Sequence, residues 1–196
     1  MAPSALAPVT LEGRAVRLEP LSERHVDALW RAGDDREIWR WYCVPITSRA
    51  DMAAWVAEAL SEAATGRTLP FATCARASGE VLGSTRFAAY SSEHERVEIG
   101  WTFVARPWQR TAVNSEAKLL MLRHAFEELG LERVELKTDR LNEASRKAIL
   151  RLGATEEGCL RSHMLCASGR RRDSVYYSIL RAEWPAAKER LERSLR

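Results

Sequence analysis

The alternation of hydrophobic and polar residues is cleanest between positions 96 and 103. In this stretch apolar side chains occupy every second position, with polar residues or glycine between them. The apolar set is Val97, Ile99, Trp101 and Phe103, and the other set is Arg96, Glu98, Gly100 and Thr102. Because successive side chains of a strand point to opposite faces, this period of two predicts a strand with one face in the core.

A longer period marks two helices in the second half of the chain. The first covers about 115–129 and ends at Gly130, and its apolar residues form more than one narrow stripe. Such a helix is expected to lie largely buried against a sheet. The second begins at the cap residue Asn142 and ends at Gly153. A short strand at 134–138 lies between them, so strand–helix–strand crossovers with parallel neighbours are predicted.

The rest of the chain adds shorter elements of both kinds. Strands are predicted at 15–19, 68–75, 81–90, 158–165 and 174–180, and helices at about 22–32, 48–65 and after Trp184-Pro185. The order β-α-α-β-β-β-α-β-α-β-β-α predicts an α/β fold, with one mixed sheet of about seven strands and helices on both faces. We expect residues 1–10 to form a short tail and residues 11–196 a single domain.

Composition narrows the function classes. The chain is 46% hydrophobic and 29% charged with a net charge of +3, and its densest basic run is only Arg170 to Arg172. This predicts a globular protein without a nucleic-acid partner. No stretch approaches the apolar length of a membrane span, and residues 1–10 do not resemble a signal peptide, so we expect no membrane partner and a cytoplasmic location.

Neither the cysteines nor the histidines are spaced like metal ligands. The four cysteines are Cys43, Cys74, Cys159 and Cys166, and none forms a C-x-x-C pair. The histidines are scattered. We therefore expect no metal site, and interpret the cysteines as small buried hydrophobes or bystanders in a reducing compartment.

Four segments together resemble a known enzyme family. They are 97–101 (VEIGW), 106–117 (RPWQRTAVNSEA), 142–145 (NEAS) and 151–154 (RLGA). In this order and spacing they resemble the GCN5-related N-acetyltransferase (GNAT) superfamily, most closely its Rim-type branch of ribosomal-protein N-terminal acetyltransferases. The resemblance covers roughly residues 11–184, almost the whole chain.

The resemblance implies a splayed sheet that holds acetyl-CoA. The cofactor is expected between the strand ending near Phe103 and the strand ending near Thr138, with its diphosphate on the loop that starts the long helix. A helix N-terminus suits a phosphate because it presents unpaired N–H groups and a partial positive charge. The expected cofactor-binding residues are Phe103, Val104, Gln109, Arg110, Thr111, Ala112, Val113, Asn114, Ser115 and Asn142.

Two of these positions leave alternatives open. The family usually has glycines at the places of Ala112 and Asn114, where the backbone must approach the phosphate and sometimes needs positive φ. The loop could instead be a plain helix entry with an Asn or Ser cap. In the family the asparagine at the place of Asn142 binds the pantetheine arm, and its alternative role is an ordinary N-cap.

The chemistry of amide formation points to Glu98 as a general base. An α-amine has a pKa of about 7.7–8.0, so only a modest base is needed to deprotonate it. Glu98 falls on the polar face of a strand expected to be central, and similar enzymes have an acid there. The structural alternative is a cross-strand ion pair with Arg86 or Arg96 that only supports the fold.

The resemblance implies two further catalytic groups. A backbone N–H near Phe103 or Val104 is expected to stabilise the carbonyl oxygen, at a bulge that family members share. Many members carry a tyrosine at the place of Ile149 to protonate the leaving thiolate. Rim-type relatives use a serine at the place of Ser145 instead, so we expect Ser145 in this role, with an ordinary first-turn serine as the alternative. No Cys/His or Ser/His/Asp set appears, which favours direct attack in a ternary complex over an acyl-enzyme.

The acceptor site is expected around the first helix–loop–helix. The predicted contacts are Trp39, Trp41, Tyr42, Arg86 and Tyr90, with Trp55 nearby. Aromatic residues in a loop often line a pocket, although core packing explains them as well. The overall hypothesis is acetyl transfer to a primary amine, of a protein N-terminus or of a small molecule. The alternative is a non-catalytic acyl-CoA-binding or protein-interaction module, and Rim-type relatives often dimerise.

Overall fold

The computed structural model describes residues 2–195 and contains one eight-stranded sheet with the order β1-β2-β3-β4-β5-β6-β8-β7. The strands are β1 Leu11–Glu12, β2 Val16–Pro20, β3 Leu69–Ala75, β4 Val81–Ser91, β5 Arg96–Val104, β6 Arg133–Asp139, β7 Thr155–Leu165 and β8 Arg171–Leu180. β5 and β6 pair in parallel and the other neighbours pair antiparallel. The predicted mixed α/β fold is confirmed, and the strand that the sequence did not reveal is the two-residue β1.

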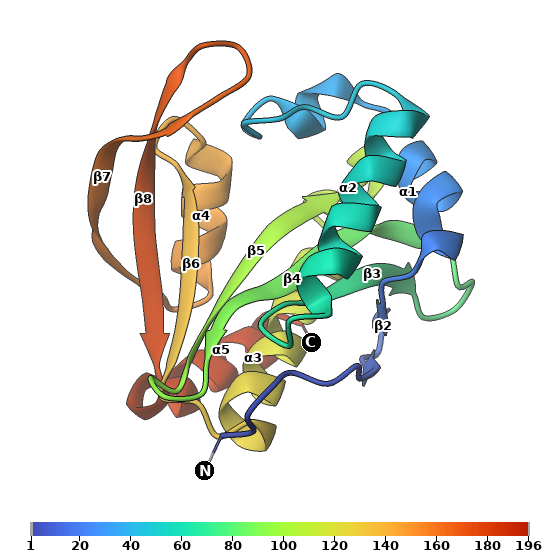
Figure 1. Ribbon diagram of the computed structural model, residues 1–196. Coiled ribbons are helices and arrows are strands. Elements are labelled where there is room, and N and C mark those ends of the chain that lie inside the picture. Colours follow the sequence, from blue (N-terminus) through green and yellow to red (C-terminus); the bar gives the residue numbers. More distant parts are fainter. Residues whose placement is uncertain (1, 196) are drawn as a thin grey trace.

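Helices cover both faces of this sheet. They are α1 Val26–Ala32, α2 Arg49–Ala63, α3 Ala112–Arg123, α4 Glu143–Arg151 and α5 Trp184–Ser194. Figure 1 shows α1 and α2 on one face, and α3 and α5 on the other. Two buried clusters follow this division: one holds the apolar residues of α1 and α2, and the larger one those of α3 to α5. Within residues 2–195, no helix has the length and apolar character needed to cross a bilayer.

Helix α3 differs from its prediction at both ends. It begins at Ala112 rather than near Ser115, because Thr111 takes the N-cap position and its Oγ1 accepts the amide of Val113 at 3.3 Å. At the other end the helix widens into a π-helical turn over His124–Glu128. The predicted stop at Gly130 is present, with φ of +67° in the left-handed region that glycine adopts easily.

The carboxylate of Glu116 anchors α3 to the first strands. It is buried and accepts the amides of Arg14, Ala15 and Val16, each at 2.7 Å. Three charge-assisted hydrogen bonds satisfy a buried carboxylate that would otherwise be costly to desolvate. The start of α3 is therefore held at a fixed height over the sheet.

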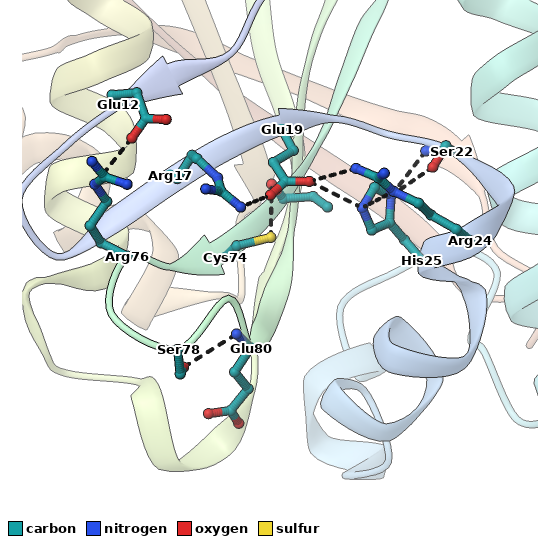
Figure 2. A network of polar contacts seen from close by, with 11 residues as sticks. Glu12, Arg17, Glu19, Ser22, Arg24, His25, Cys74, Arg76, Ser78 and Glu80 are labelled. Carbon is teal, nitrogen blue, oxygen red and sulfur yellow. Dashed lines mark hydrogen bonds and ion pairs between the residues drawn. The ribbon is translucent and has the colours of Figure 1, made fainter.

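A polar network secures the strand that leads into α1 (Figure 2). Glu19 on β2 accepts hydrogen bonds from Arg17 and, at 2.8 Å, from Arg24. Burial alone would raise the pKa of Glu19, but the neighbouring Arg17, Arg24 and His25 lower it. Burial lowers the pKa of His25, whose Nδ1 accepts the amide of Ser22 at 3.0 Å. These contacts give His25 a structural role at the helix entry.

The residues expected as a free tail lie against the domain. The amide of Leu6 donates to the carbonyl of Gly66 at 2.8 Å, and the Leu6 side chain is buried in the larger core. The hydroxyl of Tyr90 donates to the carbonyl of Pro3. Residues 2–10 are thus irregular in conformation and are held to the fold at Pro3 and Leu6.

Candidate active site

Strands β5 and β6 separate at the centre of the sheet. They pair only at Arg96–Arg133, Val97–Val134 and Glu98–Glu135. Beyond Glu98, β5 continues to Val104 and β6 to Asp139 with no ladder between them, and Figure 1 shows the two strands diverging. The predicted splay is confirmed, and it leaves one edge of β5 open to an extended ligand.

A β-bulge lies in β5 where the splay opens. Ser84 of β4 faces Phe103 and Arg86 faces Gly100, so β5 carries one extra residue between these pairs. Trp101, in the bulge, has φ of +48°, an uncommon value for a residue with a side chain. The bulge starts two residues before Phe103, and it re-aims the backbone that follows it.

Lys118 of α3 fastens this bulge from the core side. Its Nζ donates to Thr85 Oγ1 at 2.8 Å and to Thr102 Oγ1 at 2.6 Å, which links α3 to both β4 and β5. Lys118 is buried, and this burial lowers its pKa to about 7. A buried amine with hydroxyl partners and no carboxylate favours its neutral form.

We expect this amine to make stability depend on pH. The unfolded chain keeps the Lys118 proton up to about pH 10.5, whereas the folded chain loses it near pH 7. The free energy of unfolding should therefore rise through this window, by up to about 1.4 kcal/mol per pH unit. In urea unfolding, the wild type should gain roughly 2 kcal/mol over Lys118→Met between pH 7 and pH 9. Parallel stability curves for the two proteins would show that Lys118 is protonated in the fold.

Glu98 lies at the point where β5 and β6 part. Its side chain is buried, and Lys137 Nζ from β6 donates to Oε2 at 2.8 Å. Oε1 lies over Gly100, where the Cβ of any other residue would stand 3.0 Å away. The carboxylate therefore leans along β5 toward the bulge, in space that only a glycine leaves free.

The arginines proposed as alternative partners of Glu98 pair elsewhere. Arg86 Nη1 donates to Glu62 Oε2 and Arg96 Nη1 to Glu135 Oε2, each at 3.2 Å. The ion pair that Glu98 does make, with Lys137, spans the two diverging strands. It holds the carboxylate in the splay.

The start of α3 forms the second part of the site. Ala112 and Asn114 both lie in the helix, and the left-handed residue of the loop is Arg110, with φ of +62°. The missing glycines therefore impose no strain at Ala112 or Asn114. The amide of Val113 is capped by the Thr111 hydroxyl, and the amides of Ala112 and Asn114 come before the first i→i−4 bond of the helix. These two amides remain available to an anion.

A cavity of about 930 Å³ adjoins this helix start. Its walls come from the α3 N-terminus, α4 and α5. Among residues 2–195 its lining includes the cations Arg110, Lys147, Arg151 and Arg190 and no acidic side chain. Its basic side chains and the unpaired amides beside it give this cavity the positive potential that a polyanion would need.

Comparisons with known proteins agree with this geometry. The model of the acetyltransferase (GNAT) domain matches residues 15–155, most of the chain. The chain belongs to the GNAT family. It is 32% identical to a GCN5-related N-acetyltransferase from Brucella melitensis, whose crystal structure superposes with a TM-score of 0.91 over 100% of this chain and 88% of that one.

Two further relatives widen the GNAT comparison. An uncharacterized N-acetyltransferase of Bacillus subtilis, YoaA, is 26% identical over 87% of this chain and 96% of its own length. RimJ of Mycobacterium smegmatis, solved in complex with CoA-disulfide, shares the fold with a TM-score of 0.79 at 24% identity, over 98% of this chain and 95% of that one. Family membership identifies this GNAT protein as an N-acetyltransferase and argues against the non-catalytic alternative.

Asn142 and Ser145 meet at the start of α4, beyond the end of β6. Asn142 Oδ1 accepts the amide of Ser145 at 3.1 Å, so Asn142 is an N-cap. Both side chains are half-buried. The capping bond uses the side-chain oxygen, and the Asn142 amide group and the Ser145 hydroxyl are left for other partners.

The aromatic residues predicted for the acceptor site divide into two groups. Trp39 and Trp55 are buried and pack against Phe103, with ring centroids 4.9 and 6.1 Å apart. Trp41 and Tyr42 are half-buried and lie in the loop between α1 and α2. The first group therefore builds the core under this loop. Of the second group, Tyr42 packs edge-on against Trp39, with ring centroids 5.0 Å apart.

Arg86 and Tyr90 lie in different surroundings. The Arg86 guanidinium is buried between the rings of Trp55 and Trp101, with Cζ 4.7 and 4.9 Å from their centroids. Burial lowers its pKa. Tyr90 is not brought to this group, since it packs in the larger core and binds Pro3.

Two polar residues near the splay were missed from the sequence. Lys137 binds Glu98 and lies over the rings of Trp101 and Tyr176, at 5.6 and 5.8 Å. Asp139, at the end of β6, is buried and accepts Arg170 Nη2 at 2.5 Å. The signal was present, because Lys137 and Asp139 alternate with Val134, Leu136 and Thr138 along the strand predicted there.

Proposed function

We propose that this N-acetyltransferase takes its acetyl group from acetyl-CoA and transfers it to the α-amino group of a protein chain. The observation that carries the proposal is the basic cavity at the start of α3, next to an open edge of β5. CoA combines a diphosphate and a 3′-phosphate with a long, amide-containing arm. A site for it needs both a polyanion pocket and an unpaired strand edge, and this chain has the two side by side.

The residues present fit the cofactor. The amides of Ala112 and Asn114 would receive the diphosphate, with the Ser115 hydroxyl beside them, and Lys147, Arg151 and Arg190 would offset its charge together with that of the 3′-phosphate. The open edge of β5 around Phe103 and Val104 would pair with the arm, near the amide group of Asn142. Gln109 Nε2 donates to the Val104 carbonyl at 3.0 Å, which ties this loop to the strand.

The side chains around the splay suit direct acyl transfer. Acetyl-CoA would supply an activated acetyl group as a thioester. Glu98 would accept the proton of the attacking amine, held in place by Lys137. Backbone N–H groups after the bulge would donate to the acetyl oxygen as negative charge develops there. The Ser145 hydroxyl would protonate the departing thiolate.

Two comparisons favour a protein acceptor over a small molecule. The Bacillus subtilis protein YdaF, with the provisional name of a ribosomal N-acetyltransferase, is 33% identical over 110 residues, which are 56% of this chain and 59% of YdaF. RimJ has the same fold. These relatives support placing the chain in the Rim-type branch.

A peptide screen tests this assignment. We expect the purified protein to release CoA thiol from acetyl-CoA in the presence of some peptides with free α-amines, and mass spectrometry to place the acetyl group on that amine. Peptides with a blocked N-terminus should give no product. Acetylation of small amines alone would contradict the proposed acceptor, and no acetyl-CoA binding in calorimetry would contradict the proposed cofactor.

Reversal of one charge in the basic cavity should weaken cofactor binding. Lys147 is exposed on α4 and lines the cavity. We expect Lys147→Glu to raise the Kd for acetyl-CoA about tenfold in calorimetry, or ~1.4 kcal/mol, more at low salt than at high salt. Arg161→Glu makes the same charge change at an exposed position on β7, outside the cavity. Equal effects of the two substitutions would mean that net charge alone matters.

A further inference from the structure

Two thiols that are far apart in the sequence lie in contact. The Sγ atoms of Cys43 and Cys166 are 2.6 Å apart, although 123 positions separate the residues. Both cysteines are free. The sequence contains no C-x-x-C motif, so this pair exists only because the fold brings two loops together. It also changes the interpretation of both residues as bystanders.

The main chain already holds the two loops against each other. The amide of Ala167 donates to the carbonyl of Cys43 at 2.8 Å. The turn that carries Cys166 is closed by backbone hydrogen bonds of its own, between Cys166 and Arg170 at 2.9 Å and between Gly169 and Cys166 at 2.9 Å. A bond between the two sulfur atoms would therefore require little movement of the backbone.

This contact lies beside residues that the sequence predicts for the acceptor site. Cys43 follows Trp41 and Tyr42 in the loop between α1 and α2, and Cys166 lies in the turn of the β7–β8 hairpin. Figure 1 shows these two segments facing each other on one side of the molecule. Arg170 of the same turn binds Asp139 at the end of β6, and its Cζ lies 5.8 Å from the Trp41 ring.

The four cysteines differ in their environments. Cys43 is half-buried, so a small oxidant can reach it, whereas Cys166 is buried. Burial, and then the neighbouring Cys43, raises the pKa of the Cys166 thiol. Cys159 is exposed and Cys74 is buried, where burial raises its pKa to about 11. Only the Cys43–Cys166 pair combines access with a second sulfur.

We propose that Cys43 and Cys166 form a reversible disulfide that fixes the width of the entrance to the acceptor site. The oxidant is a small-molecule disulfide. The Cys43 thiolate attacks one of its sulfur atoms and releases the first small thiol. Cys166, after losing its proton, attacks the Cys43 sulfur and expels the second, so two electrons and two protons pass to the oxidant. Small dithiols reverse the reaction, as expected of a cytosolic redox-sensing pair.

Mass spectrometry tests the bond independently of any activity. The full-length protein is treated with oxidised glutathione, alkylated and digested without reduction. We expect a cross-linked peptide pair containing Cys43 and Cys166, and glutathione attached to Cys159. Cys43→Ser should abolish the cross-link, and Cys159→Ser should leave it intact. Separate glutathione adducts on Cys43 and Cys166, or two alkylated thiols, would overturn the proposal.

The consequence for the entrance rests on the proposed function and needs two further readouts. The oxidised wild type should melt roughly 5–10 °C higher than the reduced protein, because a long loop is closed. Its kcat/KM for a peptide acceptor should fall about fivefold, while its Kd for acetyl-CoA stays within about twofold. Cys43→Ser should show neither change. A cross-link without any change in kcat/KM would remove the gating role, whereas a protein inactive in both redox states would count against the proposed function alone.

Discussion

Replacement of Glu98 by Gln is expected to lower kcat at least ~100-fold for a peptide acceptor, with the Kd for acetyl-CoA nearly unchanged. Gln keeps the size of the side chain and an acceptor for Lys137, so the ion pair becomes a hydrogen bond without a cavity. What it removes is the capacity to accept a proton. Rates should recover in part above pH 8, where the free amine, with a pKa of about 7.7–8.0, loses its proton to solvent.

Glu135→Gln is the matched control for this experiment. Glu135 faces Glu98 across the short parallel ladder, but its carboxylate pairs with Arg133 and Arg96, outside the splay. Steady-state kinetics and calorimetry on both variants should show a large kcat loss for Glu98→Gln and kcat within about twofold of wild type for Glu135→Gln. Equal and small losses would assign Glu98 to the fold and leave the proton acceptor to be found elsewhere.

Gly83→Ala is expected to destabilise the protein by about 4 kcal/mol or more, near the upper end of single substitutions. Gly83 has φ of +156° and faces Val104 across the β4–β5 ladder. A Cβ at this position would lie 2.0 Å from the carbonyl oxygen of Phe103, which is main chain and cannot rotate away. The two strands would have to separate beside the bulge, so any folded fraction should also lose catalytic activity.

Gly79→Ala provides the control. Gly79 also has positive φ, at +73°, but a Cβ there would meet nothing within 4 Å. It should cost only about 1–2 kcal/mol, the price of the left-handed conformation. Denaturant unfolding of the two variants separates the clash from the backbone preference. Losses of equal size would mean that β4 and β5 can relax around Phe103.

Local patterns predicted most of the fold. The alternation in residues 96–103 and the capping residues Asn142 and Gly130 gave elements that the structure confirms. The predicted start of α3 was wrong by three residues. The N-cap is Thr111, whose hydroxyl accepts the amide of Val113, rather than Asn114 or Ser115. The strand β1 is too short to leave a periodic signal.

The contacts that define the site could not be predicted from local patterns. The bulge at Trp101 depends on how β4 and β5 align, which is a property of two strands rather than one. The sequence pattern places Lys137 on the polar face of β6. Its ion pair with Glu98 forms only because β5 and β6 stop pairing after Glu98 and Glu135. The Cys43–Cys166 contact joins loops from opposite halves of the chain.

The loop before α3 departs from the family pattern without backbone strain at the changed positions. The sequence departs from the family pattern because Ala112 and Asn114 stand where the family usually has glycines. In the structure both residues are helical, and the positive φ falls on Arg110, a lining residue of the basic cavity. The residues of the motif differ from the family's, but the start of α3 still presents unpaired amides.

A crystal structure of the protein with CoA is the most direct test of the account. The account predicts phosphate oxygens within hydrogen-bond distance of the Ala112 and Asn114 amides. It also predicts the pantetheine arm between β5 and β6, with its sulfur near Glu98 and Ser145. CoA bound at another surface, or β5 and β6 zipped together beyond Glu98 in that crystal, would contradict it.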